Sequence, residues 1–229
     1  MNAFDYFILV SDFSIAMAMV IGFTNTYKSG KLSTYYYKLF WIGCLIGSTW
    51  EFTFLFLGPE FLHSVKEWPF GLGGWPRKLS HSIWDGGLFM VGVYFCLKYL
   101  KAPHFHRFSR NELGIMLSWG IFQELLVEYL FNGRVWVYEP LSWNPVIIPS
   151  LPGSATEVGY TLIPQAVWVV APIIFYLFSL HFEKKIIRFQ QVYLSFYAPD
   201  LLQENIKSNL LLLMEYAYPY PENKIFGIL

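Results

Sequence analysis

The sequence predicts an all-α, polytopic membrane protein in which five transmembrane helices form a bundle around an internal polar cavity. Composition is the first reason. Hydrophobic residues make up 55% of the 229 residues and charged residues only 14%, against about 25% charged residues in an ordinary soluble domain. The mean hydropathy is +0.40. The second reason is pattern, because the apolar residues form long stretches that contain isolated ionisable side chains.

Each predicted helix is an apolar stretch of the required length. A helix needs about 20 apolar residues to cross the hydrocarbon core of a bilayer. The segments that meet this requirement are residues 4–24, 39–57, 79–100, 113–131 and 159–182. The first has no basic n-region and no clear cleavage site, so we interpret it as a span and not as a signal peptide. Cys44 and Cys96 lie inside spans, where we expect them to pack as small apolar residues.

Loop charges predict the orientation of the bundle, because cytoplasmic loops carry an excess of Lys and Arg. Basic residues follow the first, third and fifth spans: Lys28, Lys31, Lys38, Lys101, Arg107, Arg110, Lys184, Lys185 and Arg188. Lys66, Arg77 and Lys78 fall in the predicted loop 59–78 and oppose this pattern. We expect a multi-pass protein with a non-cytoplasmic N-terminus and a cytoplasmic C-terminus, in the endoplasmic reticulum if the host is a eukaryote.

Two long loops and a tail complete the predicted organisation. Residues 59–78 and 132–158 are rich in Pro, Gly, Trp and Tyr, which break regular structure and suit the membrane interface. We expect these loops to form a lid over the bundle. The membrane domain is predicted to cover residues 1–188, followed by a cytoplasmic tail at 189–229. Asp200 is placed to cap a short amphipathic helix in that tail.

A layer of polar side chains at one depth is the main functional signal. Asp12, Glu51, Asp85, Glu124 and Gln165 each lie six to eight residues from the non-cytoplasmic end of their predicted span. Because span directions alternate, all five fall roughly 9–12 Å below that end at 1.5 Å per residue. A carboxylate at this depth costs about 3 kcal/mol or more, so it normally faces the bundle interior.

Helical spacing adds further side chains to this layer. Residues three or four positions apart share a helix face. By this rule His81 joins Asp85, Glu128 joins Glu124, and Trp168 joins Gln165, while Trp50 and Trp84 are neighbours of Glu51 and Asp85. The competing interpretation is that these residues only link helices through hydrogen bonds.

Crowded carboxylates in a low dielectric do not all stay ionised, so one can hold a proton while another accepts one. That arrangement suits general acid–base catalysis, and aromatic faces beside it stabilise a passing cation. We therefore assign Glu51, Asp85 and Glu124 as catalytic candidates. The substrate-binding candidates are Asp12, Trp50, His81, Trp84, Glu128, Gln165 and Trp168. The expected ligand is a hydrophobic small molecule, namely a sterol, a terpenoid or an amine lipid, and a homodimer is left open.

Other chemistries lack their residues in this sequence. Five His cannot supply the ligands of a membrane di-iron enzyme, and His104 and His106 lie in a basic loop. The sequence contains no Asp-rich diphosphate motif, no C-x-x-C and no phosphate-binding G-x-x-x-x-G-K-S/T. We expect no metal and no cofactor, and the net charge of zero gives no reason to expect nucleic acid.

Several segments resemble one membrane-protein family. The run from Gln165 to Pro172, with Trp168 inside it, is similar to the Asn-Ala-x-Trp-x-x-x-Pro run in the last span of emopamil-binding proteins. These are the sterol Δ8–Δ7 isomerases of the EXPERA superfamily. Glu51 and Asp85 resemble the acids of that family's second and third spans. Residues 120–124 resemble the Gly-Gln-x-x-Gly-Asp stretch of its fourth span, with Glu124 at or next to the acid.

The resemblance covers residues 39–183 and implies a five-span sterol isomerase. It implies that the carboxylates protonate and deprotonate a sterol double bond and that Trp168 stabilises the cation. Two positions depart from the family pattern, because Gly47 stands in place of a His and Gln165 in place of an Asn. Trp50-Glu51-Phe52 also resembles a motif of small integral-membrane terpene cyclases, although those have seven spans. A non-catalytic sterol- or amine-binding protein of the EXPERA type is the alternative outside enzymes.

Overall fold

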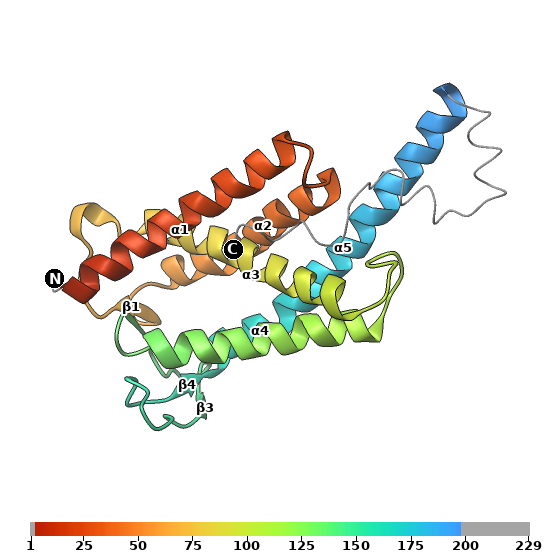
Figure 1. Ribbon diagram of the computed structural model, residues 1–229. Coiled ribbons are helices and arrows are strands. Elements are labelled where there is room, and N and C mark those ends of the chain that lie inside the picture. The colour runs from red at the N-terminus through yellow and green to blue at the C-terminus, as the bar shows by residue number, and fades with distance from the viewer. Residues whose placement is uncertain (1–2, 198–229) are drawn as a thin grey trace.

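A computed structural model describes residues 3–197, and these residues form five α-helices and four short strands (Figure 1). The helices are α1 (Ala3–Lys28), α2 (Thr34–Leu57), α3 (Trp75–Tyr99), α4 (Arg110–Phe131) and α5 (Leu162–Tyr197). The strands are β1 (Leu62–Ser64), β2 (Trp136–Tyr138), β3 (Val146–Ile148) and β4 (Tyr160–Thr161), and a 3₁₀ turn, η1, covers Pro69–Gly71. The mostly helical fold predicted from the sequence is confirmed.

The helix starts follow ordinary capping chemistry. The Ser33 hydroxyl accepts a hydrogen bond from the Tyr36 N–H at the start of α2, and the Ser109 hydroxyl accepts one from the Glu112 N–H at the start of α4. A proline in the first turn, Pro76, begins α3. This start lies four residues before the predicted one, so the prediction that Arg77 and Lys78 are loop residues is wrong.

Within residues 3–197, four helices are long and apolar enough to cross a membrane: α1 from Asp5, α2, α4, and α5 as far as Phe182. This supports an integral membrane protein. Helix α3 is not among these four, and its first half carries the polar residues Arg77, Lys78, His81 and Asp85. The helix α5 runs on to Tyr197, through the predicted domain boundary at 188. The amphipathic helix predicted after Asp200 lies outside the described residues.

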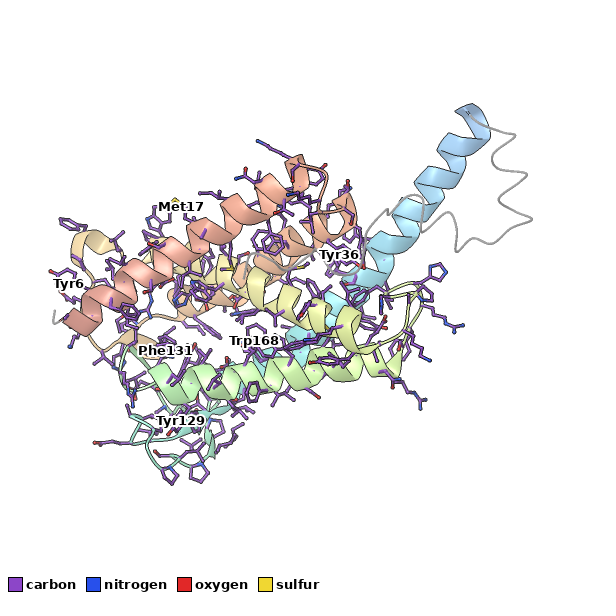
Figure 2. The ribbon with its side chains drawn as sticks, in the orientation of Figure 1. Tyr6, Met17, Tyr36, Tyr129, Phe131 and Trp168 are labelled. Carbon is purple, nitrogen blue, oxygen red and sulfur yellow. The ribbon has the colours of Figure 1, made fainter. Side chains whose placement is uncertain are left out.

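Helix α3 is the centre of the bundle and packs against α1, α2 and α4, while α5 packs against α2 and α4. Glycines allow α2 and α3 to approach closely. A Cβ atom added to Gly43 would lie 2.9 Å from the Gly86 Cα atom. In contrast, α1 contributes few buried residues, and Tyr6 and Met17 point outward from it (Figure 2).

The two long loops contain strands that the sequence analysis did not predict. Strands β1 and β2 pair antiparallel, with His63 opposite Val137, and β3 pairs antiparallel with β4. Because β1 precedes α3 and β2 follows α4, the first pairing joins the two predicted loops at one end of the bundle (Figure 1). Strands of two or three residues are too short to leave an alternating pattern that sequence analysis could detect.

Candidate functional site

A group of paired charges lies around the first turns of α3, and we call it the paired network. It consists of Asp12 from α1, Glu51 from α2, and Arg77, Lys78 and His81 from α3. The Lys78 Nζ atom donates a hydrogen bond to Glu51 Oε2 at 2.9 Å, and both side chains are buried. The His81 Nε2 atom lies 3.1 Å from Asp12 Oδ2, and its Nδ1 atom lies 3.7 Å from Glu51 Oε2. His81 therefore bridges a carboxylate of α1 and a carboxylate of α2.

Asp12 ties α1 to α3 through both its carboxylate and its backbone. The Ser80 hydroxyl donates to Asp12 Oδ1 at 2.5 Å, and the Trp84 indole N–H donates to the Asp12 carbonyl at 3.1 Å. The Arg77 Nε atom lies 3.9 Å from Asp12 Oδ2 and donates to His81 Nε2 at 3.3 Å. Two carboxylates and two permanent cations balance each other here, which explains how charges are buried in this bundle.

The Arg77 guanidinium also connects the network to the loops. It lies over the Trp68 ring at 4.3 Å and over the Trp136 ring at 5.4 Å, and it donates to the Ser64 hydroxyl at 3.1 Å. Trp68 precedes η1, while Ser64 and Trp136 belong to β1 and β2. Residues of both loops thus contact the network at this end of the bundle.

A second group of polar side chains lies deeper and has few partners; we call it the unpaired layer: Asp85, Gln123, Glu124 and Gln165. Asp85 is 6% exposed and Gln123 is 2% exposed. Among the described residues, no hydrogen-bond partner lies within reach of Asp85 Oδ2, Gln123 Oε1 or Gln165 Nε2, and all three atoms are buried. Buried polar atoms without partners are uncommon and costly.

Gly47 explains how Asp85 is accommodated between α2 and α3. A Cβ atom added to Gly47 would lie 2.5 Å from Asp85 Oδ2 and 2.6 Å from Asp85 Cβ. The Asp85 side chain therefore occupies the space that any larger residue at position 47 would need. The glycine that departs from the isomerase pattern is thus matched to the position of Asp85.

Contacts between helices place the unpaired layer at one level. On α3 and α4, the Trp119 indole N–H donates to the Leu88 carbonyl at 2.8 Å. The two helices run antiparallel. Asp85 lies about one turn before Leu88 on α3, and Gln123 lies about one turn after Trp119 on α4, so these two side chains are at the same level of the bundle. On α4 and α5, a Cβ added to Gly120 would lie 3.0 Å from the Trp168 carbonyl. From this contact, one turn toward the end of the bundle that carries the strands leads from Gly120 to Gln123 and Glu124 on α4, and from Trp168 to Gln165 on α5.

The two acids of α4 differ in their partners. Glu128 is 1% exposed and accepts hydrogen bonds from Asn132 Nδ2 at 2.7 Å and from the Trp136 indole at 3.4 Å. Glu124 is buried and interacts electrostatically with Glu128, Asp85 and Glu51. The carboxyl groups of α2, α3 and α4 are therefore close enough to influence one another.

An aromatic cluster lies directly below these carboxyl groups. The ring of Trp168 lies 5.7 Å from that of Trp50 and 5.3 Å from that of Phe89, and Phe89 stacks on Phe175 at 4.6 Å. Figure 2 shows Trp168 in the interior of the bundle. Asp85 is one turn from Phe89, Glu51 is next to Trp50, and Gly120, one turn from Glu124, contacts Trp168.

Tyr138 of β2 brings a loop residue to the carboxyl groups. Its ring packs on Phe54 at 5.8 Å and on Phe61 at 5.6 Å. Burial, followed by the charges of Glu128, Glu51 and Glu124, raises the pKa of Tyr138 well above its usual value. Burial therefore disfavours the charged phenolate form of Tyr138.

Most of the predicted site residues fall into the paired network, the unpaired layer or the aromatic cluster. Trp84 and Asp12 contact each other, and Glu128 belongs to the end covered by β2. Arg77, Lys78, Tyr138 and Gln123 are absent from the predicted set. Pro76, which favours a helix start before Arg77, and the four-residue spacing of Arg77 and His81 were the available signals for the first two.

Nothing in the described part of the chain forms a group of three or more His, Cys, Asp and Glu side chains able to hold a metal ion. The scan against family models, the search of curated proteins and the search of solved structures each gave no match for this chain.

Proposed function

We propose that this protein is a membrane isomerase that moves a double bond in a sterol or terpenoid by proton transfer from and to buried carboxyl groups. The observation that carries the proposal is the position of Glu51, Asp85 and Glu124, which come from three helices and lie next to an aromatic cluster formed by Trp50, Phe89 and Trp168. The resemblance of residues 165–172 to sterol isomerases supports the same reaction.

The proposal includes α3 as a fifth span, with the N-terminus on the non-cytoplasmic side and the sheet β1–β2 covering that end. Helix α3 has 25 residues, and at roughly 1.5 Å per residue this is long enough to cross the membrane. Pairing of Arg77 and Lys78 with Asp12 and Glu51 lowers the cost of keeping these charges in the bundle. Counted as helix residues, they no longer oppose the orientation that the other loop charges predict.

The reaction begins with a proton on Glu124, which has no cationic partner among the described residues. Its O–H bond breaks and a C–H bond forms at one carbon of the double bond, which leaves a carbocation at the other carbon. Trp168 and Trp50 stabilise this cation through their ring faces. A C–H bond on the neighbouring carbon then breaks, and Glu51 accepts that proton while the electron pair forms the shifted double bond.

Glu51 suits the acceptor role because the Lys78 ammonium, 2.9 Å away, favours its negative charge. Asp85 interacts electrostatically with both Glu51 and Glu124. It therefore influences the charge of both carboxyl groups. After each turnover Glu51 releases one proton and Glu124 takes one up, so the number of protons on the protein is unchanged. No redox step and no leaving group are involved, so the reaction balances without a co-reactant.

One observation favours a second function, the binding of an amine lipid without catalysis. The carboxyl groups of Asp85 and Glu124 contact no cation among the described residues, and they lie beside aromatic rings. A ligand ammonium placed there would pair with a carboxylate and lie over an indole face.

Deuterium incorporation distinguishes the two functions. The full-length protein, reconstituted in lipid nanodiscs prepared in D₂O, is incubated with a panel of unsaturated sterols and terpenoids. An isomerase produces a double-bond isomer that carries one deuterium at the newly protonated carbon, which mass spectrometry and NMR detect. Glu51→Gln and Glu124→Gln are expected to abolish this product, whereas Ser179→Ala, about four helical turns further along α5 than Gln165, retains it. No isomer and no label across the panel would leave lipid binding as the better account.

A further inference from the structure

Strands β3 and β4 belong to a segment that lies beside the bundle, residues 141–161, which we call the β3–β4 hairpin. Figure 1 shows it alongside the C-terminal part of α4, with α4 between the hairpin and α1. The Tyr129 hydroxyl of α4 donates to the Pro152 carbonyl at 3.2 Å, and Figure 2 shows Tyr129 on the side of α4 that faces the hairpin. A Cβ atom added to Gly133 would lie 2.5 Å from the Ala155 carbonyl oxygen. The hairpin is therefore packed against the last turn of α4.

The hairpin is also joined to the start of α5. The Leu162 N–H donates to the Pro145 carbonyl at 2.9 Å, and the Ile163 N–H donates to the Asn144 Oδ1 atom at 2.8 Å. Helix α4, which ends at Phe131, and helix α5 are both long and apolar enough to cross a membrane. The two sets of contacts place the hairpin level with the ends of two spans, where the hydrocarbon core of a bilayer meets the headgroups.

The surface of the hairpin is apolar. Five large apolar side chains in it are between 38% and 47% exposed: Trp143, Val146, Ile147, Leu151 and Val158. Glu157 is the only charged residue of the hairpin, whereas the loop before α3 contains Glu60, Lys66 and Glu67. Exposed apolar side chains gathered in one segment mark a surface that another molecule or a membrane covers.

The backbone of the hairpin is suited to the membrane boundary. Irregular backbone is excluded from the hydrocarbon core, because its polar groups are costly there unless they are satisfied within the protein. Leu141 and Asn144 exchange N–H···O bonds of 3.2 and 2.9 Å, and β3 pairs with β4. The Trp143 ring stacks on Phe61 with a centroid distance of 5.2 Å, and indole rings favour the membrane interface.

We propose that the β3–β4 hairpin lies within the lipid leaflet beside α4 and α5, with Trp143, Ile147 and Leu151 in contact with phospholipid acyl chains. Lipid is the partner because the apolar surface continues onto the face that α5 exposes along the membrane. Leu162 and Val169 lie on one face of α5, about two turns apart, and both are exposed to the same degree as the hairpin side chains. This inference does not depend on the proposed reaction.

Spin labels determine whether lipid or water surrounds the hairpin. Ile147→Cys and Leu151→Cys are introduced one at a time into the full-length protein, whose buried free cysteines, Cys44 and Cys96, are first replaced by Ala. Each labelled protein is reconstituted in phosphatidylcholine nanodiscs. Oxygen concentrates among acyl chains and a polar nickel chelate stays in water, so the ratio of their collision rates with the label reports its surroundings.

Two further labels calibrate this ratio. Val170→Cys, in the middle of the α5 span, is the lipid control, and Glu67→Cys, an exposed position in the loop before α3, is the water control. We expect the labels at positions 147 and 151 to give a collision ratio several-fold above that at position 67. Their ratio should stay below that at position 170, because the hairpin is level with the ends of the spans.

A second measurement keeps both cysteines and decides the question if their replacement lowers thermal stability. Trp143→Phe retains a ring beside Phe61 and removes one indole, so the emission lost in the variant is that of Trp143. In nanodiscs made from phosphatidylcholine with brominated acyl chains, we expect most of this emission to be quenched in the parent protein.

Two results would overturn the inference. A collision ratio at positions 147 and 151 equal to that at position 67, or an unquenched Trp143, would mean that water surrounds the hairpin. Labels that neither oxygen nor the nickel chelate reaches would mean that another protein chain, such as a second copy, covers it. Both results would leave the proposed isomerase untouched, because its test measures a product formed at carboxyl groups inside the bundle.

Discussion

The paired network and the unpaired layer are neighbouring groups of buried polar side chains with opposite properties. In the network, Glu51 has Lys78 at 2.9 Å and Asp12 has Ser80 at 2.5 Å and His81 at 3.1 Å. In the layer, Asp85, Gln123 and Gln165 each carry a buried atom for which the described residues offer no hydrogen-bond partner. Satisfied charges hold helices together, whereas unsatisfied groups are available to a ligand, so burial of a polar side chain in a helix does not by itself indicate one role.

The largest effect is expected from breaking the network. Lys78→Met leaves the Glu51 carboxylate buried without its cation, and removing one partner of a buried pair costs about 3–5 kcal/mol. We expect a large fall in the melting temperature of the detergent-solubilised protein. The double variant Lys78→Met/Glu51→Gln should recover most of that stability, because the uncompensated charge is gone. A single variant as stable as the parent protein would show that the pair is not structural.

The next largest effect concerns turnover and belongs to the layer. Glu124→Gln keeps the shape of the side chain and removes its acidic proton, so the proposed isomerase should lose about 100-fold or more in rate. The melting temperature should change little, because Glu124 has no cationic partner among the described residues. Asp85→Asn is the companion variant, with slower turnover but intact binding of neutral lipid. Unchanged turnover for both would exclude these carboxyl groups from the proton transfers.

Substitutions at Trp168 distinguish a role in stabilising the cation from a role in packing alone. An indole face stabilises a desolvated cation by about 2 kcal/mol or more, so the rate should fall in the order Trp, Phe, Leu at this position. Trp168 also packs on Phe89 and Trp50, so some thermal stability will be lost as well. Rates are therefore expressed per folded molecule, with melting temperatures from the same preparations. Equal rates across the three proteins would assign Trp168 to packing alone.

The smallest effect tests the fit between Gly47 and Asp85. Gly47→Ala introduces a Cβ atom into the space of the Asp85 side chain, and we expect a loss of about 1 kcal/mol from overpacking. Asp85→Gly in the same chain should restore the stability, since it frees that space. Gly22→Ala, where an added Cβ meets no atom within 4 Å, is the control on a helix. Additive effects of the two substitutions at positions 47 and 85 would contradict the proposed contact.

Local sequence patterns were sufficient for much of the fold. Apolar length predicted five helices, and cysteine burial followed from the same stretches. Counting residues along alternating helices predicted one depth for five polar residues. The structure has Asp85, Glu124 and Gln165 at one level, but Asp12 and Glu51 lie about one turn nearer the end of the bundle, beside His81 and Lys78. The paired network could not be predicted in this way. Its ion pairs join position 78 to 51 and position 77 to 12, and sequence spacing does not specify contacts between different helices.

The sequence by itself determined the helical segments and the burial of acids within them, because both depend on the length and composition of contiguous residues. Only the tertiary structure decided which acids have cationic partners. Arg77 and Lys78 look like loop charges in the chain, yet they are buried in α3 because Asp12 and Glu51 meet them there. The same packing leaves Asp85 against Gly47 without a hydrogen-bond donor for its Oδ2 atom among the described residues, since the cations at that end are already bound by other carboxylates.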